Sequence, residues 1–224
     1  RATLLTTRGQ GQQYHGTKTP IKGMSDNIYD YAGEQNIFGP GFYTTDALDI
    51  AIGYSKPKKS KQASVYSVNE KTPQKLYDIE KPVAEFEKMA EKSSSQFIKE
   101  MLEEKPKSVR EIYDNIADYA EAEGLAGYEA QELFDDVADV LRKNGYDGIT
   151  HRGGLIANNP EHKVKIYWNP ENLEIQQMSY PKKFQEVSKV KPVELPATLT
   201  KAIDTPKKVE QKVEKKVEQK VTPP

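Results

Sequence analysis

Two kinds of hydrophobic pattern divide the chain. Alternating apolar and polar positions rich in β-branched residues predict strands on both sides of a central block that has helical spacing. The expected strands lie within residues 2–16 (one or two short strands), at 42–45 after a Gly-Pro-Gly turn, and at 63–68, 75–79, 146–151 and 163–168, followed by a last apolar pair at 173 and 175.

Helical signals fill the central block. A capping box, Ser108-Val-Arg-Glu111, precedes apolar residues at helical spacing and predicts a helix that ends at Gly124. A second helix is expected from about Tyr128 to the Asn144-Gly145 cap. A shorter helix of two to three turns should start with Asp46 as its N-cap and end by Ser55.

The order of these elements is typical of an α+β domain. We expect a mostly antiparallel sheet with a helical insertion at about residues 83–144, together forming a domain over residues 1–180. Residues 181–224 contain six Pro and one aromatic residue, Phe184, too little apolar surface to offset the entropy of ordering. This Lys-, Val-, Glu- and Pro-rich tail is predicted to be a disordered linker, with a Val-striped partner-binding helix over 207–221 as the less favoured interpretation.

Composition removes several classes of function. The 224 residues leave no room for a large multidomain enzyme, and the absence of Cys excludes disulfides, thiolate metal sites and a Cys nucleophile. No apolar run approaches the roughly 20 residues of a membrane span. Because the chain starts at Arg1 without a Met or a signal sequence, we expect a processed or excised end, as part of a larger polypeptide or a virion.

Charge is distributed unevenly along the chain. Residues 181–224 hold 11 Lys against 5 Glu and 1 Asp, a surplus of +5, so the total of −1 leaves −6 for residues 1–180. An acidic body repels phosphate backbones, which makes nucleic acid an unlikely main partner.

Three features of the sequence suggest chemistry. His15 stands beside Gly16 at an expected strand end, Tyr43 and Tyr54 lie eleven residues apart across a strand-to-helix junction, and His162 precedes a strand. On the short helix, Ala51 and Tyr54 share one face, which leaves room for a flat ring.

These features belong to an ordered set of motifs. In chain order the set is Tyr14-His-Gly-Thr17, Gly41-Phe-Tyr-Thr-Thr-Asp46 with Ala51-x-x-Tyr54, Val65-Tyr-Ser-Val68, Gly145-Tyr-Asp-Gly-Ile149 and Ile166-Tyr-Trp-Asn-Pro-Glu-Asn-Leu173. In this arrangement the chain resembles the ADP-ribosyltransferase superfamily, in its diphtheria-toxin and poly(ADP-ribose) polymerase branch, and is most similar to phage and bacterial members. The resemblance covers residues 14–175 apart from the helical insertion, and it implies the split antiparallel sheet of that superfamily.

The resemblance implies NAD as co-substrate, without a metal. By position, His15 would bind the adenosine-side ribose, the Gly16 backbone the nicotinamide amide, and Tyr54 would stack on the nicotinamide ring opposite Tyr43. Thr17 and Ala51 complete the NAD-binding set. A flat cationic ring between aromatic faces gains roughly 0.5–2 kcal/mol per face from stacking and cation–π attraction.

One family position differs. Val164 stands where the resemblance places a catalytic Glu. We therefore consider His162 and Glu161 as hypothetical replacements for it. Together with Tyr43 they form the expected catalytic set. The expected activity is therefore transfer of one ADP-ribose from NAD to a macromolecular, protein acceptor, with release of nicotinamide. Such an effector would act in the cytoplasm, or be delivered into a host cell in a virion or by secretion.

Other functions remain open. Val164 and the tail also fit an inactive interaction or virion protein with this fold. A metal-free nuclease could pair His15 with His151 or His162 as acid and base. Arg152 and the two following glycines could hold a phosphate, although a turn after a strand is favoured. A three-His metal site is the weakest alternative, because the histidines lack metal-ligand spacing.

Overall fold

The computed structural model describes residues 11–18, 20–24, 38–55, 64–125, 128–154 and 160–178. The predicted tail at 181–224 and the first ten residues of the chain lie outside these ranges.

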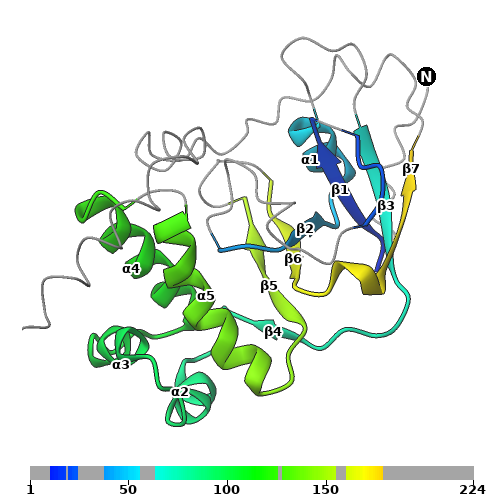
Figure 1. The fold of residues 1–224 in the computed structure, drawn as a ribbon. Helices are drawn as coiled ribbons and strands as arrows, with labels where there is room; N and C mark the ends of the chain where they lie inside the picture. Colours follow the sequence, from blue (N-terminus) through cyan, green and yellow to red (C-terminus); the bar gives the residue numbers. More distant parts are fainter. Residues whose placement is uncertain are drawn as a thin grey trace, which may run out of the picture.

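The described strands form one seven-stranded mixed sheet with the order β4-β5-β6-β2-β1-β3-β7 (Figure 1). The strands are Gln13–Thr17 (β1), Phe42–Thr45 (β2), Ser64–Glu70 (β3), Leu76–Asp78 (β4), Gly148–Gly153 (β5), His162–Tyr167 (β6) and Leu173–Gln177 (β7). Every neighbouring pair is antiparallel except β4 with β5. The α+β class and the mostly antiparallel sheet are thereby confirmed. One expected turn is wrong, since β5 continues through His151 and Arg152 to Gly153 before Gly154 turns with a φ of 97°.

The sheet is divided between β1 and β2. These two strands share a single residue pair, Tyr14 with Thr45, whereas β1 pairs with β3 over five residues and β2 pairs with β6 over four. Figure 1 shows β1, β3 and β7 as one group beside the group that contains β2, β6 and β5.

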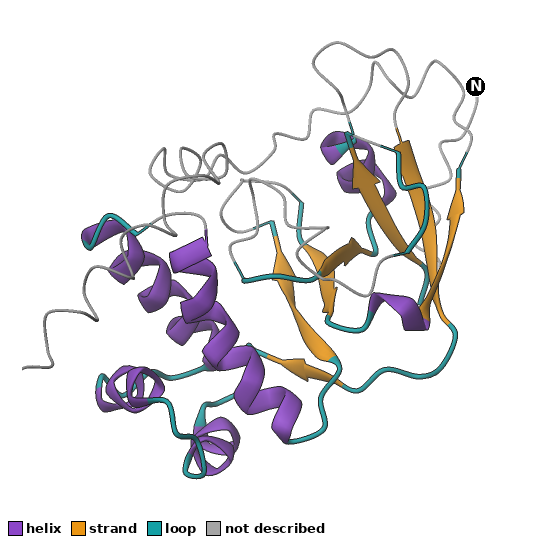
Figure 2. Ribbon diagram, viewed as in Figure 1, coloured by secondary structure: helices purple, strands orange, loops and turns teal. Residues whose placement is uncertain are grey.

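Five α-helices are described: Leu48–Tyr54 (α1), Ala84–Ala90 (α2), Gln96–Glu103 (α3), Val109–Ala122 (α4) and Tyr128–Lys143 (α5). The α4 and α5 predictions are confirmed, and Ser108 Oγ accepts a hydrogen bond from the Glu111 N–H at 3.3 Å as the capping box requires. Figure 2 shows α2 to α5 together on one side of the sheet and α1 apart from them beside β1.

The predicted N-cap of α1 is wrong. Ala47 occupies that position without a side-chain cap, while the Asp46 carboxylate accepts a hydrogen bond from the Lys163 N–H at 2.9 Å. Asp46 therefore ties the start of α1 to β6, because this backbone donor lies just beyond the end of the β2–β6 ladder.

The helices α2 to α5 connect two neighbouring parallel strands, β4 and β5. A hairpin cannot join parallel strands, so a crossover of a dozen or more residues is needed. The block expected as an insertion at 83–144 is thus the crossover connection itself.

The two faces of the sheet have different coverings. The helix face, which carries Tyr43, Ile149 and Ile166, packs against α2 to α5 in the largest hydrophobic cluster, and its β1–β3 part packs against α1. The opposite face holds a smaller cluster centred on Phe42 and Tyr167.

A polar network crosses the opposite face. Glu70 Oε1 accepts hydrogen bonds from Lys165 Nζ at 2.9 Å and from the Tyr167 hydroxyl at 2.8 Å. Burial by itself raises the pKa of Glu70, but these bonds and one from the Gln74 N–H outweigh it and lower that pKa. The network therefore holds an ionised carboxylate that joins β3 to β6.

Candidate functional site

At the β1–β2 junction, backbone groups of β1 are not paired with any of the described strands. Within an antiparallel strand, the N–H and C=O of one residue point to the same side and alternate along the chain. The Val65 carbonyl accepts a hydrogen bond from the Met178 N–H, so the peptide groups of Val65 point toward β7 and away from β1. Gly16 is the register partner of Val65, and its own N–H and C=O therefore point away from β3, toward β2. Continued pairing would place Gly16 opposite Tyr43, but the ladder ends at Tyr14 and Thr45.

His15 fills the place of the missing ladder bond. Its Nδ1 lies 2.7 Å from the Tyr43 carbonyl oxygen, which can only accept, so Nδ1 carries the proton and Nε2 presents a lone pair. The ring stacks on Phe42 with centroids 4.3 Å apart. Burial lowers the pKa of His15 to about 4. His15 is therefore a neutral hydrogen-bond acceptor held in one tautomer.

Helix α1 lies directly against Gly16. A β-carbon at position 16 would overlap the carbonyl oxygen of Ala51, so only glycine allows this approach of helix and strand. Ala51 is 1% exposed and packs with Tyr14, Ile52 and Val65. The geometry thus gives Ala51 a packing role, and the space expected for a flat ring beside it is filled by the chain.

The hydroxyl of Tyr43 is committed to the turn that precedes β2. It donates to the Gly39 carbonyl at 2.7 Å and accepts from the Phe38 N–H at 3.2 Å. Burial raises the pKa of Tyr43 well above its ordinary value, and the nearby hydroxyls of Tyr113 and Tyr54 add to the increase. Tyr43 can offer its ring to a ligand, but its hydroxyl anchors the turn and stays protonated.

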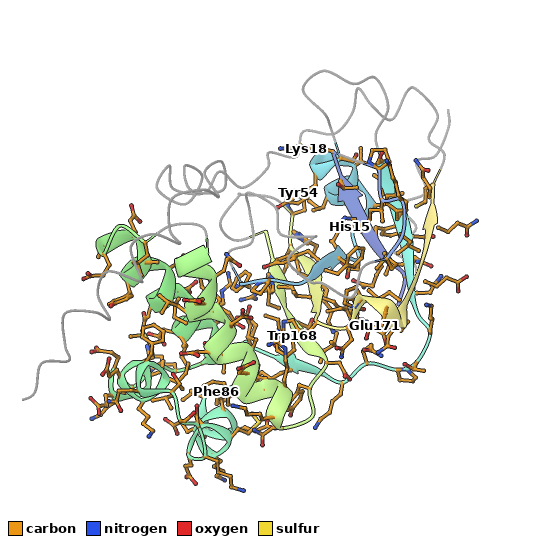
Figure 3. The ribbon with its side chains drawn as sticks, in the orientation of Figure 1. His15, Lys18, Tyr54, Phe86, Trp168 and Glu171 are labelled. Atoms are coloured by element: carbon orange, nitrogen blue, oxygen red, sulfur yellow. The ribbon has the colours of Figure 1, made fainter. Side chains whose placement is uncertain are left out.

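Tyr54 and Thr17 are half-buried residues at the ends of α1 and β1. Figure 3 shows the labelled Tyr54 and His15 in the same corner of the molecule, with Phe86 among the helices at the other end. The junction site, defined as His15, Gly16, Thr17, Tyr43 and Tyr54, thus joins residues from β1, β2 and α1.

The two proposed replacements for the catalytic Glu lie on different sides of the sheet. Val164 pairs with Thr45, and His162, two residues earlier in β6, lies with it on the helix face, which also carries Tyr43. Glu161 is exposed and forms an ion pair of 3.8 Å with Arg152, whose strand position belongs to the opposite face. Strand alternation therefore keeps His162 with Val164 and separates Glu161 from them.

The sequence did not reveal the position of His151 relative to Val164. The two residues are directly paired in the β5–β6 register and share the helix face. His151 is 7% exposed, and its ring contacts that of Phe38 with centroids 4.2 Å apart. Register between strands is a tertiary property, so no local signal could have found this neighbour.

The acid–base pairs of a nuclease are not assembled. His15 is separated from His162 by two inter-strand spacings and from His151 by three, about 10 and 14 Å at roughly 4.8 Å per strand. Among the described residues, no three His, Asp or Glu side chains are grouped to hold a metal ion. Within the described ranges, the helices lack the combination of length and hydropathy that a membrane-spanning segment needs.

Comparisons of the chain with protein-family models, with curated proteins and with solved structures returned no match. The functional interpretation therefore depends on the motifs and on the geometry of the junction site.

Proposed function

We propose that this protein binds NAD at the junction site and transfers one ADP-ribose unit to a protein acceptor, releasing nicotinamide. The observation that carries the proposal is the end of the β1–β2 ladder at Tyr14 and Thr45. Beside it, the peptide groups of Gly16 that point toward β2 have no partner among the described strands.

The junction offers hydrogen bonds that match a nicotinamide carboxamide. That group has one acceptor oxygen and an NH₂ donor, and Gly16 presents one N–H and one C=O on the same side. If the Tyr43 carbonyl were free it would compete for the amide donor, but the His15 imidazole binds it. The edge of Gly16 is thus available to a planar amide.

The side chains around Gly16 suit the rest of the nucleotide. Aromatic rings of Tyr43 and Tyr54, on β2 and α1, can hold a cationic ring by stacking and cation–π attraction. The Nε2 lone pair of His15 can accept a hydrogen bond from a ribose hydroxyl, and its neutral state at pH 7 gives it no attraction for phosphate.

In the proposed reaction the bond between the ribose C1′ and the nicotinamide nitrogen breaks, and nicotinamide leaves with the bonding electrons. The acceptor atom bonds to C1′ and loses its proton. Val164 supplies no charge to stabilise the cationic sugar, and a missing charge stabiliser costs a factor of about 10² to 10³ in rate. We therefore expect slow transfer of single ADP-ribose units, in which a carboxylate of the acceptor helps to stabilise the cationic sugar. The reaction would take place in the cytoplasm of a producing or recipient cell.

Binding and transfer are tested separately with the full chain. Calorimetric titration with NAD and with nicotinamide measures the affinity of the junction site for each ligand. Incubation with biotin-labelled NAD and cell extract measures transfer to an acceptor. Tyr54→Ala should weaken nicotinamide binding about 2- to 30-fold through loss of one stacking face. Tyr119→Ala is the matched control, because Tyr119 is a helical tyrosine on α4 that is 42% exposed.

The outcomes separate the alternatives. Labelled acceptor that disappears in His15→Ala supports the transferase. NAD binding without any label indicates a binding protein that keeps the site without turnover. Absence of both NAD and nicotinamide binding in the wild-type protein overturns the proposal.

A further inference from the structure

His151 is a buried imidazole that the proposed reaction does not yet use. In the β5–β6 register it faces Val164, and side chains so paired have β-carbons about 4.5–5.5 Å apart. Val164 in turn pairs with Thr45 of β2. His151 therefore lies on the helix face, two strands from the junction site, beside the position that lacks a carboxylate.

The hydrogen bond of His151 defines its chemistry. Nδ1 lies 3.2 Å from the Arg152 carbonyl oxygen, which also accepts a bond from Arg110 Nη1 at 3.1 Å. Because a carbonyl only accepts, the Nδ1 proton is the donor and Nε2 keeps its lone pair. No hydrogen bond to this Nε2 occurs within the described ranges of the chain.

The surroundings keep His151 neutral and fixed. Burial lowers its pKa to about 4, and the Arg110 guanidinium adds to the decrease. The Phe38 ring covers the imidazole, and the Phe38 N–H binds the Tyr43 hydroxyl. His151 is thus connected by contact to the turn that holds Tyr43.

We propose that His151 is a further binding residue of the junction site, where it accepts a hydrogen bond from a hydroxyl of the nicotinamide-side ribose of NAD. The inference rests on the proposed function. A neutral acceptor binds hydroxyl donors in preference to phosphate oxygens. It would replace the hydrogen bond that a carboxylate at position 164 could accept, but not the negative charge of that carboxylate. His162 has a similar acceptor, because its Nδ1 is bound to the Pro160 carbonyl, but its register partner is Gly153 and not Val164.

Calorimetric titration of the full chain tests the inference with four ligands: NAD, free nicotinamide, and the two NAD analogues that lack the 2′- or 3′-hydroxyl of the nicotinamide-side ribose. Removal of the acceptor by His151→Leu should weaken NAD binding about 3- to 10-fold, as expected for one hydrogen bond, and leave nicotinamide binding unchanged. His151→Gln, which retains an acceptor at the end of a side chain of similar length, should bind NAD within about 3-fold of the wild type. One of the two analogues should bind the wild type about 3- to 10-fold more weakly than NAD.

Two results would overturn the inference while the proposed function stands: equal NAD affinity of wild type and His151→Leu, or equal wild-type affinity for NAD and both analogues. The analogue comparison needs no variant, so it applies even if His151→Leu fails to fold. If the wild-type protein binds neither NAD nor nicotinamide, the proposed function itself fails, and the inference with it.

Discussion

At the residue scale, the junction site depends on two neighbours with opposite requirements. Gly16 must have no side chain because α1 touches it, and His15 must have a side chain long enough to reach the Tyr43 carbonyl. They lie where the β1–β2 ladder ends, which is the edge that the proposed function assigns to NAD. The proposed function therefore gives the His-Gly pair a binding role in addition to its structural one.

Gly16→Ala should destabilise the fold. The new β-carbon meets the Ala51 carbonyl, and overpacking of this kind costs about 1–3 kcal/mol. Urea unfolding measures the change in free energy. Gly23→Ala is the control, because a β-carbon at exposed Gly23 meets nothing within 4 Å. Equal stability of both variants would contradict the close approach of α1 to β1.

Two histidines, the half-buried His15 and the buried His151, should make stability depend on pH. The pKa values of His15 and His151 fall from 6.5 to about 4 on folding. Between these values the unfolded chain binds more protons than the folded one, so the free energy of unfolding should fall as the pH decreases, by up to about 1.4 kcal/mol per pH unit for each histidine. Urea unfolding at pH 7, 6 and 5 measures the slope.

His151→Gln should remove its share of this slope. The lowered pKa of Glu70 starts from an ordinary value of 4.5, so its contribution to stability is lost mainly below pH 5 and does not interfere. An identical slope in wild type and variant between pH 6.5 and 5 would show that folding does not lower the pKa of His151.

At the element scale, the turn at residues 38–41 links the helices to the site. A β-carbon on Gly39, whose φ is 80°, would lie 2.8 Å from that of Phe134 on α5, so the turn is pressed against this helix. The same turn binds the Tyr43 hydroxyl. The turn thereby connects α5 to the Tyr43 side chain.

The N-cap of α4 should contribute measurably to stability. Ser108→Ala removes the acceptor for the Glu111 N–H, which typically costs about 1 kcal/mol, with a range of roughly 0.5–2. Ser94→Ala, at an exposed position before α3, should change the free energy of unfolding by less than about 0.5 kcal/mol. A Ser108→Ala protein as stable as Ser94→Ala would mean that the cap is not formed in solution.

At the scale of the whole molecule, sheet and crossover helices share one hydrophobic core. The main cluster joins Phe86 of α2 and Leu141 of α5 to Ile149, Ile166 and Trp168 of the sheet region. The crossover is therefore not a separate module, and the fold should lose its helices and its sheet together.

The chain contains one Trp, so this cooperativity can be measured directly. Trp168 is 5% exposed, and the guanidinium carbon of Arg142 on α5 lies 4.9 Å from the centroid of the Trp168 ring. Urea unfolding curves from Trp168 fluorescence and from helical circular dichroism should coincide. Phe86→Ala, which empties a fully buried site, should lower both midpoints together and cost about 3–5 kcal/mol. Separate transitions would mean that the helices unfold as an independent unit.

Much of the fold could be predicted because its signals are local. Period-two alternation located β3 and β6, and the capping box and terminal glycines located α4 and α5. The helices α2 and α3 were expected only as part of a helical block. The prediction of Asp46 as an N-cap was wrong because its carboxylate accepts a hydrogen bond from the Lys163 N–H of a distant strand.

Local sequence patterns were sufficient to predict most of the described strands and the helices α4 and α5, and composition excluded thiol chemistry. These properties follow from local periodicity and composition. The tertiary structure alone decided that the helical block is a crossover, that Glu161 and Val164 lie on opposite sides, that His151 faces Val164, and that the β1–β2 ladder stops before Gly16. Strand order and register arise from hydrogen bonds between segments far apart in the chain, and local sequence patterns do not encode those pairings.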